Sequence, residues 1–372
     1  MSNPTLDNCD SRTAGRIARA TGAVLLLVWI FGAVFMSTGC AAPNRPDLPA
    51  SHTGSEREAA PAPPQFVTPP FFRIDGGDGA ALLMLGTIHL GPAEGWPFSP
   101  AMRTALRKAD SAILELDPKS SDEETAANVL AELAILPSPT LLPDVISPET
   151  AKLLEEQDAT LGSMGIPHGA RIRMKPWYIT AVLLEVNAQR SGYSMSASVD
   201  QAVAEAMGER PIVGLETIEE QLRFFDAMKP EFQDLMLRDT LANLDAGIEQ
   251  IEQLVSAWRI GDESMLLEIS REGVEELPEL AGFYDVLLRD RNFRWIEPLR
   301  RVLDEAEYEG QTIVVAVGAL HLVGPEGLPA LLRDAGYRVE SVSHSRSSWT
   351  MRDARKPETA VITSDGTAGT RR

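Results

Sequence analysis

Two histidines share one local pattern, in which each follows an apolar run and stands three residues after a glycine. His89 follows Gly86 in the run MLGTIHLGP, and His321 follows Gly318 in the run AVGALHLVGP. Neutral imidazole is a good ligand for zinc and similar divalent ions, and glycine lets the chain turn sharply or lets a ligand approach its backbone. The repeated pattern predicts a metal site, and a hydrogen-bonded structural histidine is the alternative for each position.

Two glutamates also close apolar runs, Glu115 in AILELD and Glu216 in PIVGLE. In open α/β sheets, ligands bind outside the carboxyl ends of parallel strands, so the two histidines and the two glutamates are expected to converge there. Carboxylates can complete a metal shell or serve as a general base. This set suits a hydrolytic site with a metal-bound water, and surface loop carboxylates are the alternative reading of the glutamates.

The segments that carry these residues predict an α/β fold with a mixed, largely parallel sheet. FFRIDGGDGAALLMLG reads as a hairpin, and two strand–Gly-x-x-His–helix–strand units follow from the repeated pattern. Between them, residues 121–190 and 217–308 read as mainly helical, which predicts flanking helices and a long helical insertion. Residues 147–165 and 230–261 each predict one helix.

The two ends of the chain predict processing and tethering rather than fold. Residues 1–39 resemble a lipoprotein signal peptide, because arginines precede an apolar run shorter than the roughly 20 residues that a spanning helix needs. The following STGC resembles a bacterial lipobox, in which Cys40 is lipidated. Residues 40–70 are rich in proline and alanine and predict a tether, residues 71–345 the folded domain, and residues 346–372 a disordered tail.

These features place the protein in the cell envelope, anchored to a membrane by lipid. Ala41 after Cys40 resembles lipoproteins of the outer membrane that face the periplasm, and a secreted or soluble periplasmic protein is the alternative. A formal net charge of −20 argues against nucleic acid as a partner. The mature domain has no cysteine, which excludes thiolate nucleophiles and cysteine–zinc sites there. No His-Glu-x-x-His or Gly-x-Ser-x-Gly motif is present, whereas a Ser–His–Asp triad assembled in space stays open.

The order of these motifs resembles the TraB/PrgY/GumN family, which includes the Tiki membrane metalloproteases. The resemblance covers about residues 80–345, and one departure is Ser198, where the family often has glycine before the aspartate that is Asp200 here. The matching segments are LGTIHLGP, VGALHLVGP, ILELD, PIVGLETIEEQL, KPWYITAVLL and LLRDRNFRWI.

The resemblance implies a metal-dependent hydrolase, and the candidates for its divalent ion are Mn²⁺, Co²⁺ and Zn²⁺. His89 and His321, with Glu115 as a third ligand, would hold the ion that activates a water molecule. Glu216 would be the general base, and Arg291 would stabilise an oxyanion.

The substrate implied by the resemblance is a peptide or a small molecule, with Arg291 and Asn292 in the binding site. Some members of the family are known only as inhibitors of peptide pheromones or from polysaccharide gene clusters. A non-catalytic peptide- or glycan-binding protein and an accessory protein of envelope polysaccharide export are therefore the competing hypotheses.

Overall fold

The computed structural model describes residues 65–116, 123–271 and 278–342. The predicted signal peptide, Cys40, most of the predicted tether and the predicted tail lie outside these residues. Among the residues that the structure does describe, no helix is long and apolar enough to span a membrane.

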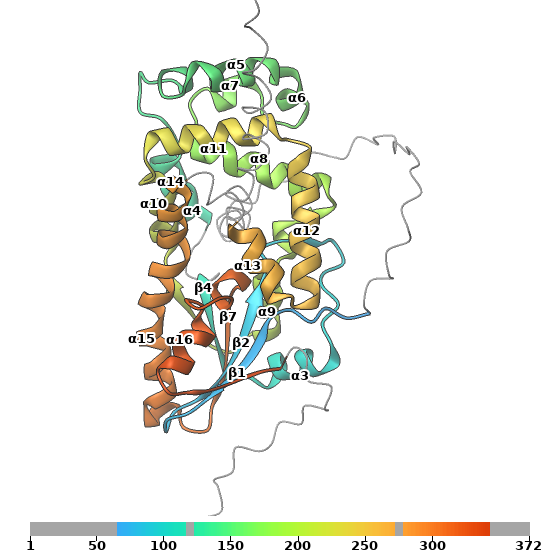
Figure 1. Ribbon diagram of the computed structural model, residues 1–372, viewed down its shortest axis with the longest axis vertical. Coiled ribbons are helices and arrows are strands. Elements are labelled where there is room, and N and C mark those ends of the chain that lie inside the picture. Colours follow the sequence, from blue (N-terminus) through green and yellow to red (C-terminus); the bar gives the residue numbers. More distant parts are fainter. Residues whose placement is uncertain (1–64, 117–122, 272–277, 343–372) are drawn as a thin grey trace, which may run out of the picture.

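A six-stranded sheet forms one end of the molecule (Figure 1). Its order is β6–β4–β7–β2–β1–β8, with β6, β4, β7 and β2 parallel and β1 antiparallel to both β2 and β8. This arrangement confirms the predicted mixed, largely parallel sheet and the predicted hairpin. The strands are β1 (Phe71–Asp75), β2 (Ala81–Thr87), β4 (Ser111–Leu116), β6 (Ile212–Glu216), β7 (Thr312–Gly318) and β8 (Arg338–Ser341), and a separate pair joins β3 (Gly91–Pro92) to β5 (Tyr193–Ser194).

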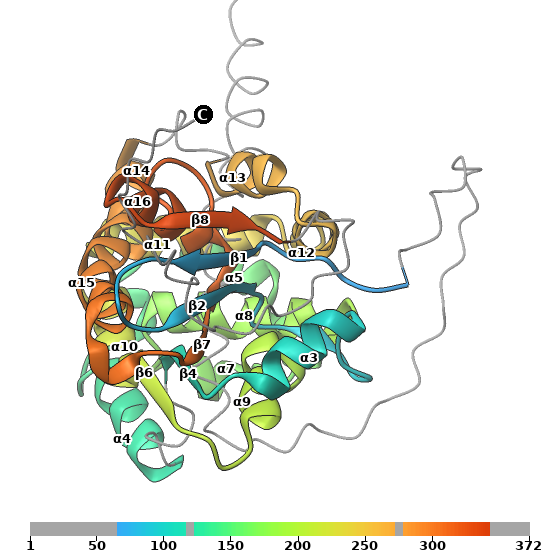
Figure 2. The same cartoon turned by 90° about the horizontal axis from the view of Figure 1, so that it is seen from below.

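Helices cover both faces of the sheet, which buries the apolar side chains that alternate along the strands. Figure 2 shows the sheet with α15 and α16 on one side and α3 and α9 on the other. Ser99 begins α3 as predicted, since its Oγ accepts a hydrogen bond from the Met102 N–H at 3.2 Å. The covering helices are α3 (Pro100–Lys108), α9 (Val199–Met207), α12 (Ala246–Ile260), α13 (Glu263–Arg271), α15 (Asp290–Asp304) and α16 (Leu328–Asp334).

A layer of helices beyond the carboxyl ends of the strands forms the other end of the molecule (Figure 1). It has its own apolar core, which Leu183 of α8 and Leu237 of α11 share. The helices of this layer are α4 (Glu123–Leu133), α5 (Pro148–Glu156), α6 (Asp158–Ser163), α7 (His168–Arg171), α8 (Pro176–Arg190), α10 (Ile218–Asp226), α11 (Pro230–Ala242) and α14 (Pro278–Tyr284).

Two single-helix predictions are wrong. The segment 147–165 divides at Gln157 into α5 and α6, and the segment 230–261 divides into α11 and α12. The second break has a physical reason, because the Asn187 side chain of α8 donates to the Leu244 carbonyl at 2.9 Å and satisfies it outside a helix. This tertiary contact determines where the chain turns between α11 and α12, and the hydrophobic period of the sequence does not predict such a contact.

Asp239 is an acid buried in the helical layer, with an exposed fraction of 5%. Its Oδ1 accepts from Asn243 at 3.1 Å, whereas its Oδ2 has no hydrogen-bond partner among the described residues. Burial raises the pKa of Asp239 to about 7. Because the folded protein then holds this proton more tightly than the unfolded chain, the free energy of unfolding falls as the pH rises from about 4 to 7.

Asp239→Asn is expected to stabilise the protein above pH 7, by on the order of 2 kcal/mol, because the neutral amide avoids a buried charge. Urea unfolding at pH 5 and pH 8 measures this effect, and the gain should be much smaller at pH 5. Glu231→Gln, on the exposed side of the same helix, is the control. Equal stability of Asp239→Asn and the unmodified protein at pH 8 would show that the carboxylate is not desolvated.

Candidate functional site

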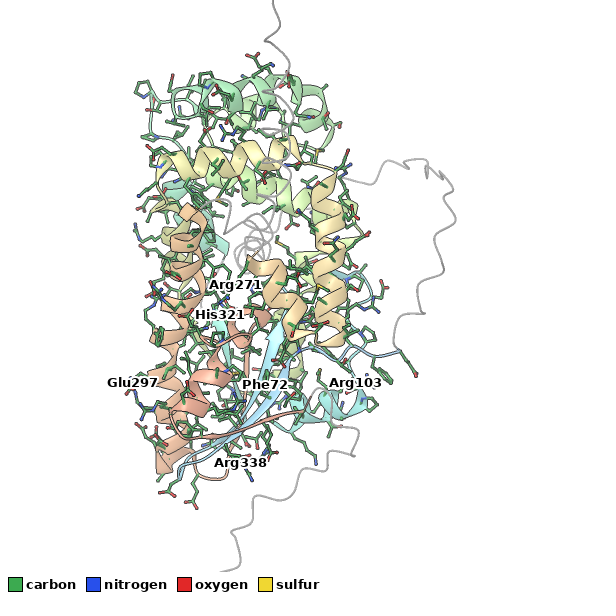
Figure 3. All side chains as sticks on the ribbon, in the orientation of Figure 1. Phe72, Arg103, Arg271, Glu297, His321 and Arg338 are labelled. Carbon is green, nitrogen blue, oxygen red and sulfur yellow. The ribbon has the colours of Figure 1, made fainter. Side chains whose placement is uncertain are left out.

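The carboxyl ends of four parallel strands meet at one edge of the sheet, as the strand-end prediction requires. Thr87 of β2 pairs with Gly318 of β7, and Leu116 of β4 pairs with Glu216 of β6. Figure 3 shows His321 at this edge, whereas Arg338 lies at the opposite end of the sheet. The edge faces the helical layer, so the strand ends are enclosed rather than open to solvent.

Arg291 occupies the centre of the site and is fully buried. Its Nε donates to both oxygens of Glu216, at 3.1 and 3.0 Å, and its Nη2 donates to Glu115 Oε2 at 2.6 Å. Its Nη1 lies 3.2 Å from His321 Nε2, and its guanidinium carbon lies 4.6 Å from the ring centroid of Trp295. One guanidinium therefore joins a residue from each of three strand ends.

Glu115 is a buried carboxylate that stays ionised. Burial alone would raise its pKa, but the positive charge of Arg291 and, to a smaller extent, the nearby histidines and the Gly318 N–H lower the pKa to about 2. The Gly318 N–H donates to its Oε1 at 2.7 Å, and Gln221 Nε2 lies 3.3 Å from its Oε2. This residue has the charge that a metal ligand needs, and its low basicity argues against a role as proton acceptor.

Glu216 is held by two arginines. Besides the bonds from Arg291, its Oε1 accepts from Arg294 Nη2 at 3.0 Å, and Arg294 is half exposed. Both oxygens of this carboxylate are thus engaged by cations. Its predicted role as general base stays a prediction, and proton uptake would require one of these hydrogen bonds to break.

His321 has a defined tautomer, because Asn292 fixes one side of its ring. Asn292 Nδ2 donates to the carbonyls of His321 and Glu326, at 3.3 and 2.8 Å, so its Oδ1 is the atom that accepts from His321 Nδ1 at 2.7 Å. The ring proton is on Nδ1, and Nε2 carries the lone pair. Burial lowers the pKa of His321 to about 3, so the ring is neutral at physiological pH.

His89 repeats this arrangement with an acidic partner. Its Nδ1 lies 2.7 Å from Asp200 Oδ2, and Thr87 Oγ1 donates to the other oxygen of Asp200 at 3.0 Å. Burial lowers the pKa of His89, but Asp200 more than offsets this effect and the pKa is raised overall. The Nε2 atom is buried and has no hydrogen-bond partner among the described residues.

Several residues that position the site were missed in the sequence. Asp200, which the family resemblance named without a role, has a direct role at His89. Ser198, the departure from the family pattern, begins α9 by accepting from the Gln201 N–H at 3.1 Å, so it preserves the turn. The sequence signals for Asp200 were its match to the family's aspartate and its place at the start of a helix. Arg294 and Trp295, next to Arg291, were also missed.

The sequence pattern predicts that Gly86 allows a sharp turn. That prediction is wrong, because Gly86 lies within β2. A Cβ on Gly86 would lie 2.9 Å from Ala319 Cβ and 3.0 Å from Ala319 Cα. The glycine therefore lets the helical turn that carries His321 approach β2. Trp258 holds the same strand end, since its Nε1 donates to the Gly86 carbonyl at 2.9 Å.

The donor set fits a divalent ion in its chemistry. Both histidines have Nδ1 held by an acceptor and Nε2 directed away from it, which is the usual arrangement of metal-binding histidines. His89 Nε2 is a buried donor atom without a partner, and His321 Nε2 lies 3.6 Å from Glu115 Oε1. As they stand, however, the described residues form no cluster of three or more His, Cys, Asp or Glu side chains that could hold a metal. Arg291 lies among the candidate ligands instead.

The fold and the site define an α/β protein with paired Gly-x-x-His strand ends around a buried arginine. The TraB/PrgY/gumN family pattern matches residues 70–341, and the chain belongs to this family, which confirms the predicted resemblance. It is 29% identical over 254 residues to the "Uncharacterized protein YbaP" of Escherichia coli (strain K12), which covers 67% of this chain and 87% of that protein. The Shigella flexneri protein of the same name has the same identity and coverage, and no solved structure matches.

Arg291→Leu is expected to lower the free energy of unfolding by about 3–5 kcal/mol, because two buried carboxylates lose their counter-ion. Equilibrium denaturation measures the loss. Arg294→Leu, which removes the half-exposed partner of Glu216, should cost under about 1 kcal/mol. Adding Glu115→Gln and Glu216→Gln to Arg291→Leu should recover part of the stability, and no recovery would contradict a charge-based role.

Proposed function

We propose that this protein is a metal-dependent hydrolase of the cell envelope that acts on peptides. The observation that carries the proposal is the matched orientation of two buried histidines at adjacent strand ends. Asp200 fixes the orientation of the His89 ring, and Asn292 fixes that of the His321 ring. Each contact is made to the Nδ1 atom of its histidine. A purely structural histidine has no need of a buried, unpartnered Nε2 such as that of His89, whereas a metal ligand does.

His89 Nε2, His321 Nε2 and Glu115 would hold the divalent ion, with Mn²⁺, Co²⁺ and Zn²⁺ as candidates. When bound, such an ion polarises a carbonyl group and lowers the pKa of its water to near neutrality. Asp200 and Asn292 engage the Nδ1 atoms, so the Nε2 atoms of both rings would be the ones to hold the ion, once His89 releases the second ring proton that its raised pKa favours. Arg291 must give up its contact with His321 Nε2 for this ligand set to be complete.

Glu216 is proposed as the general base that takes the proton of the attacking water. Arg294 can keep its bond to Oε1 while Arg291 releases Oε2, which would leave one oxygen of the carboxylate free. The released Arg291 guanidinium would then be available to bind the oxyanion, in the role proposed for it. Asn292 is predicted to bind substrate, but its contacts with His321 support a positioning role instead.

The location in the envelope is proposed from the sequence alone. The signal peptide and the lipid on Cys40 fall on residues outside those that the structure describes. Lipid attached to Cys40 would hold the domain at the outer membrane facing the periplasm, and an unanchored periplasmic protein is the alternative.

His89→Ala and His321→Ala are each expected to abolish metal binding and to lower peptide hydrolysis by about 100-fold or more. Elemental analysis of the purified full chain measures the metal, and turnover of a peptide library with added Mn²⁺, Co²⁺ or Zn²⁺ measures the hydrolysis. His168→Ala should retain the metal, because His168 is an exposed residue of α7. Hydrolysis that persists in either strand-end variant would refute the proposed mechanism.

A non-catalytic binding protein is the second candidate, and the Arg291 contacts favour it. In the structure this guanidinium already neutralises Glu115 and Glu216 and contacts His321 Nε2. If that network is permanent, the protein would bind a peptide or glycan without turnover. Peptide binding that is insensitive to a chelator and to Glu216→Gln, with no hydrolysis under any metal, would support this candidate.

A further inference from the structure

We propose that the helical layer contains a second peptide-binding site, which takes an apolar side chain adjacent to a lysine or arginine. The proposal rests on the proposed function, because it names the class of peptide that the enzyme would hold. The site is a cavity of about 410 Å³ between the short helix Leu142–Asp144 and the helices α5 and α7. Figure 1 shows α5, α6 and α7 at the end of the molecule farthest from the sheet.

The walls of this cavity are apolar. Leu142 and Leu154 belong to the core of the helical layer and are 2% and 7% exposed, and Ile146 and Ile172 are half-buried beside them. The cavity opens to solvent, because Pro143, Glu155 and His168 of its lining are exposed. A space of several hundred Å³ lined by aliphatic side chains is typical of a ligand pocket, and it has room for one or two aliphatic residues of a peptide.

The rim of the cavity is acidic. Glu155 is exposed on the rim, and it makes no ion pair within the described part of the chain. Asp158 pairs with the buried Arg171, whose Nη1 also donates to the Ile166 carbonyl at 2.9 Å. The charges of Asp158 and Arg171 cancel, so with His168 of the lining neutral, Glu155 leaves the rim with a net negative charge.

This charge selects the ligand class. A fatty acid or another apolar anion would meet Glu155 at the rim, and Arg171, the arginine of the lining, is already paired with Asp158. A cationic group next to the apolar anchor would instead gain a favourable interaction. The net charge of −20 for the whole chain favours the approach of cationic peptides as well.

The cavity is separate from the strand-end site. All of its lining residues lie between positions 142 and 172, and none of them contributes to the Arg291 network. Binding at the cavity can therefore be measured without hydrolysis, in the presence of a chelator.

The test uses the full chain in EDTA and three capped peptides: acetyl-Leu-Leu-Lys-Lys-amide, acetyl-Leu-Leu-Glu-Glu-amide and acetyl-Ser-Ser-Lys-Lys-amide. Isothermal titration should show the first peptide binding about tenfold or more tightly than either of the others, because each of them lacks one of the two interactions. Methyl NMR should show shifts of Ile146 and Leu154 on titration with the first peptide. Equal affinity for the glutamate peptide would overturn the proposal, as would shifts at Leu320 beside His321 without shifts at Ile146.

Two variants test the cavity itself. Ala151→Trp fills the space from α5 and should weaken binding about tenfold or more, whereas Glu155→Gln should weaken it about threefold. Glu156→Gln, which lies on the same helix outside the lining, is the matched control, and circular dichroism confirms that each variant folds. Unchanged affinity in Ala151→Trp would overturn the proposal.

The outcomes separate this inference from the proposed function. Tight binding of the lysine peptide with no hydrolysis under any metal would retain the second site and reject the hydrolase. Metal-dependent hydrolysis with no binding at the cavity would retain the hydrolase and reject the second site.

Discussion

The rest of the structure depends on the ion pairs that the buried Arg291 guanidinium makes with Glu115 and Glu216. This guanidinium joins α15 to Glu115 on β4, to Glu216 on β6 and to His321 beyond β7, with no exposure to solvent. A single buried charge would be very costly, and two carboxylates without a cation would be costlier still, so each member of the network requires the others. This mutual requirement fixes the position of α15 against the strand ends, and with it the shape of the site.

The proposed metal binding implies two states of this network. With Arg291 in place, the negative charges at the strand ends are neutralised by the protein itself, and His321 Nε2 has an internal partner. A bound divalent ion would supply the same neutralisation from outside and would leave Arg291 able to bind an oxyanion or a substrate carboxylate. Asp200 and Asn292 hold the two histidines in the orientation required by the second state. His89 Nε2 is buried and has no partner among the described residues, which is the feature of the metal-free site that favours the proposed metal-bound state.

The sequence was sufficient to find the site where the signal was local. His89, Glu115, Glu216 and His321 each close an apolar run, and parallel strands bring such ends together without further information. Arg291 had no local signal and was identified only through the family resemblance. A π-helical segment (Asp285–Arg289) precedes it and changes the direction in which the following residues face, and no helical period along the chain predicts such a segment. The contact of Asp200 with His89 was not predicted because the two residues lie 111 positions apart. The cavity at Leu142 was not predicted because it depends on how the helices pack.

The most direct measurement is a ¹⁵N NMR titration of the two strand-end histidines with Zn²⁺ in the full chain. The metal-free protein at neutral pH should show His321 neutral, with its proton on Nδ1. On titration, the Nε2 resonances of both His89 and His321 should shift together at one equivalent of metal, while both Nδ1 atoms stay protonated. A shift confined to one histidine, or an Nε2 resonance of His321 that does not change under saturating metal, would contradict a shared ion and leave Arg291 as the permanent occupant of the site.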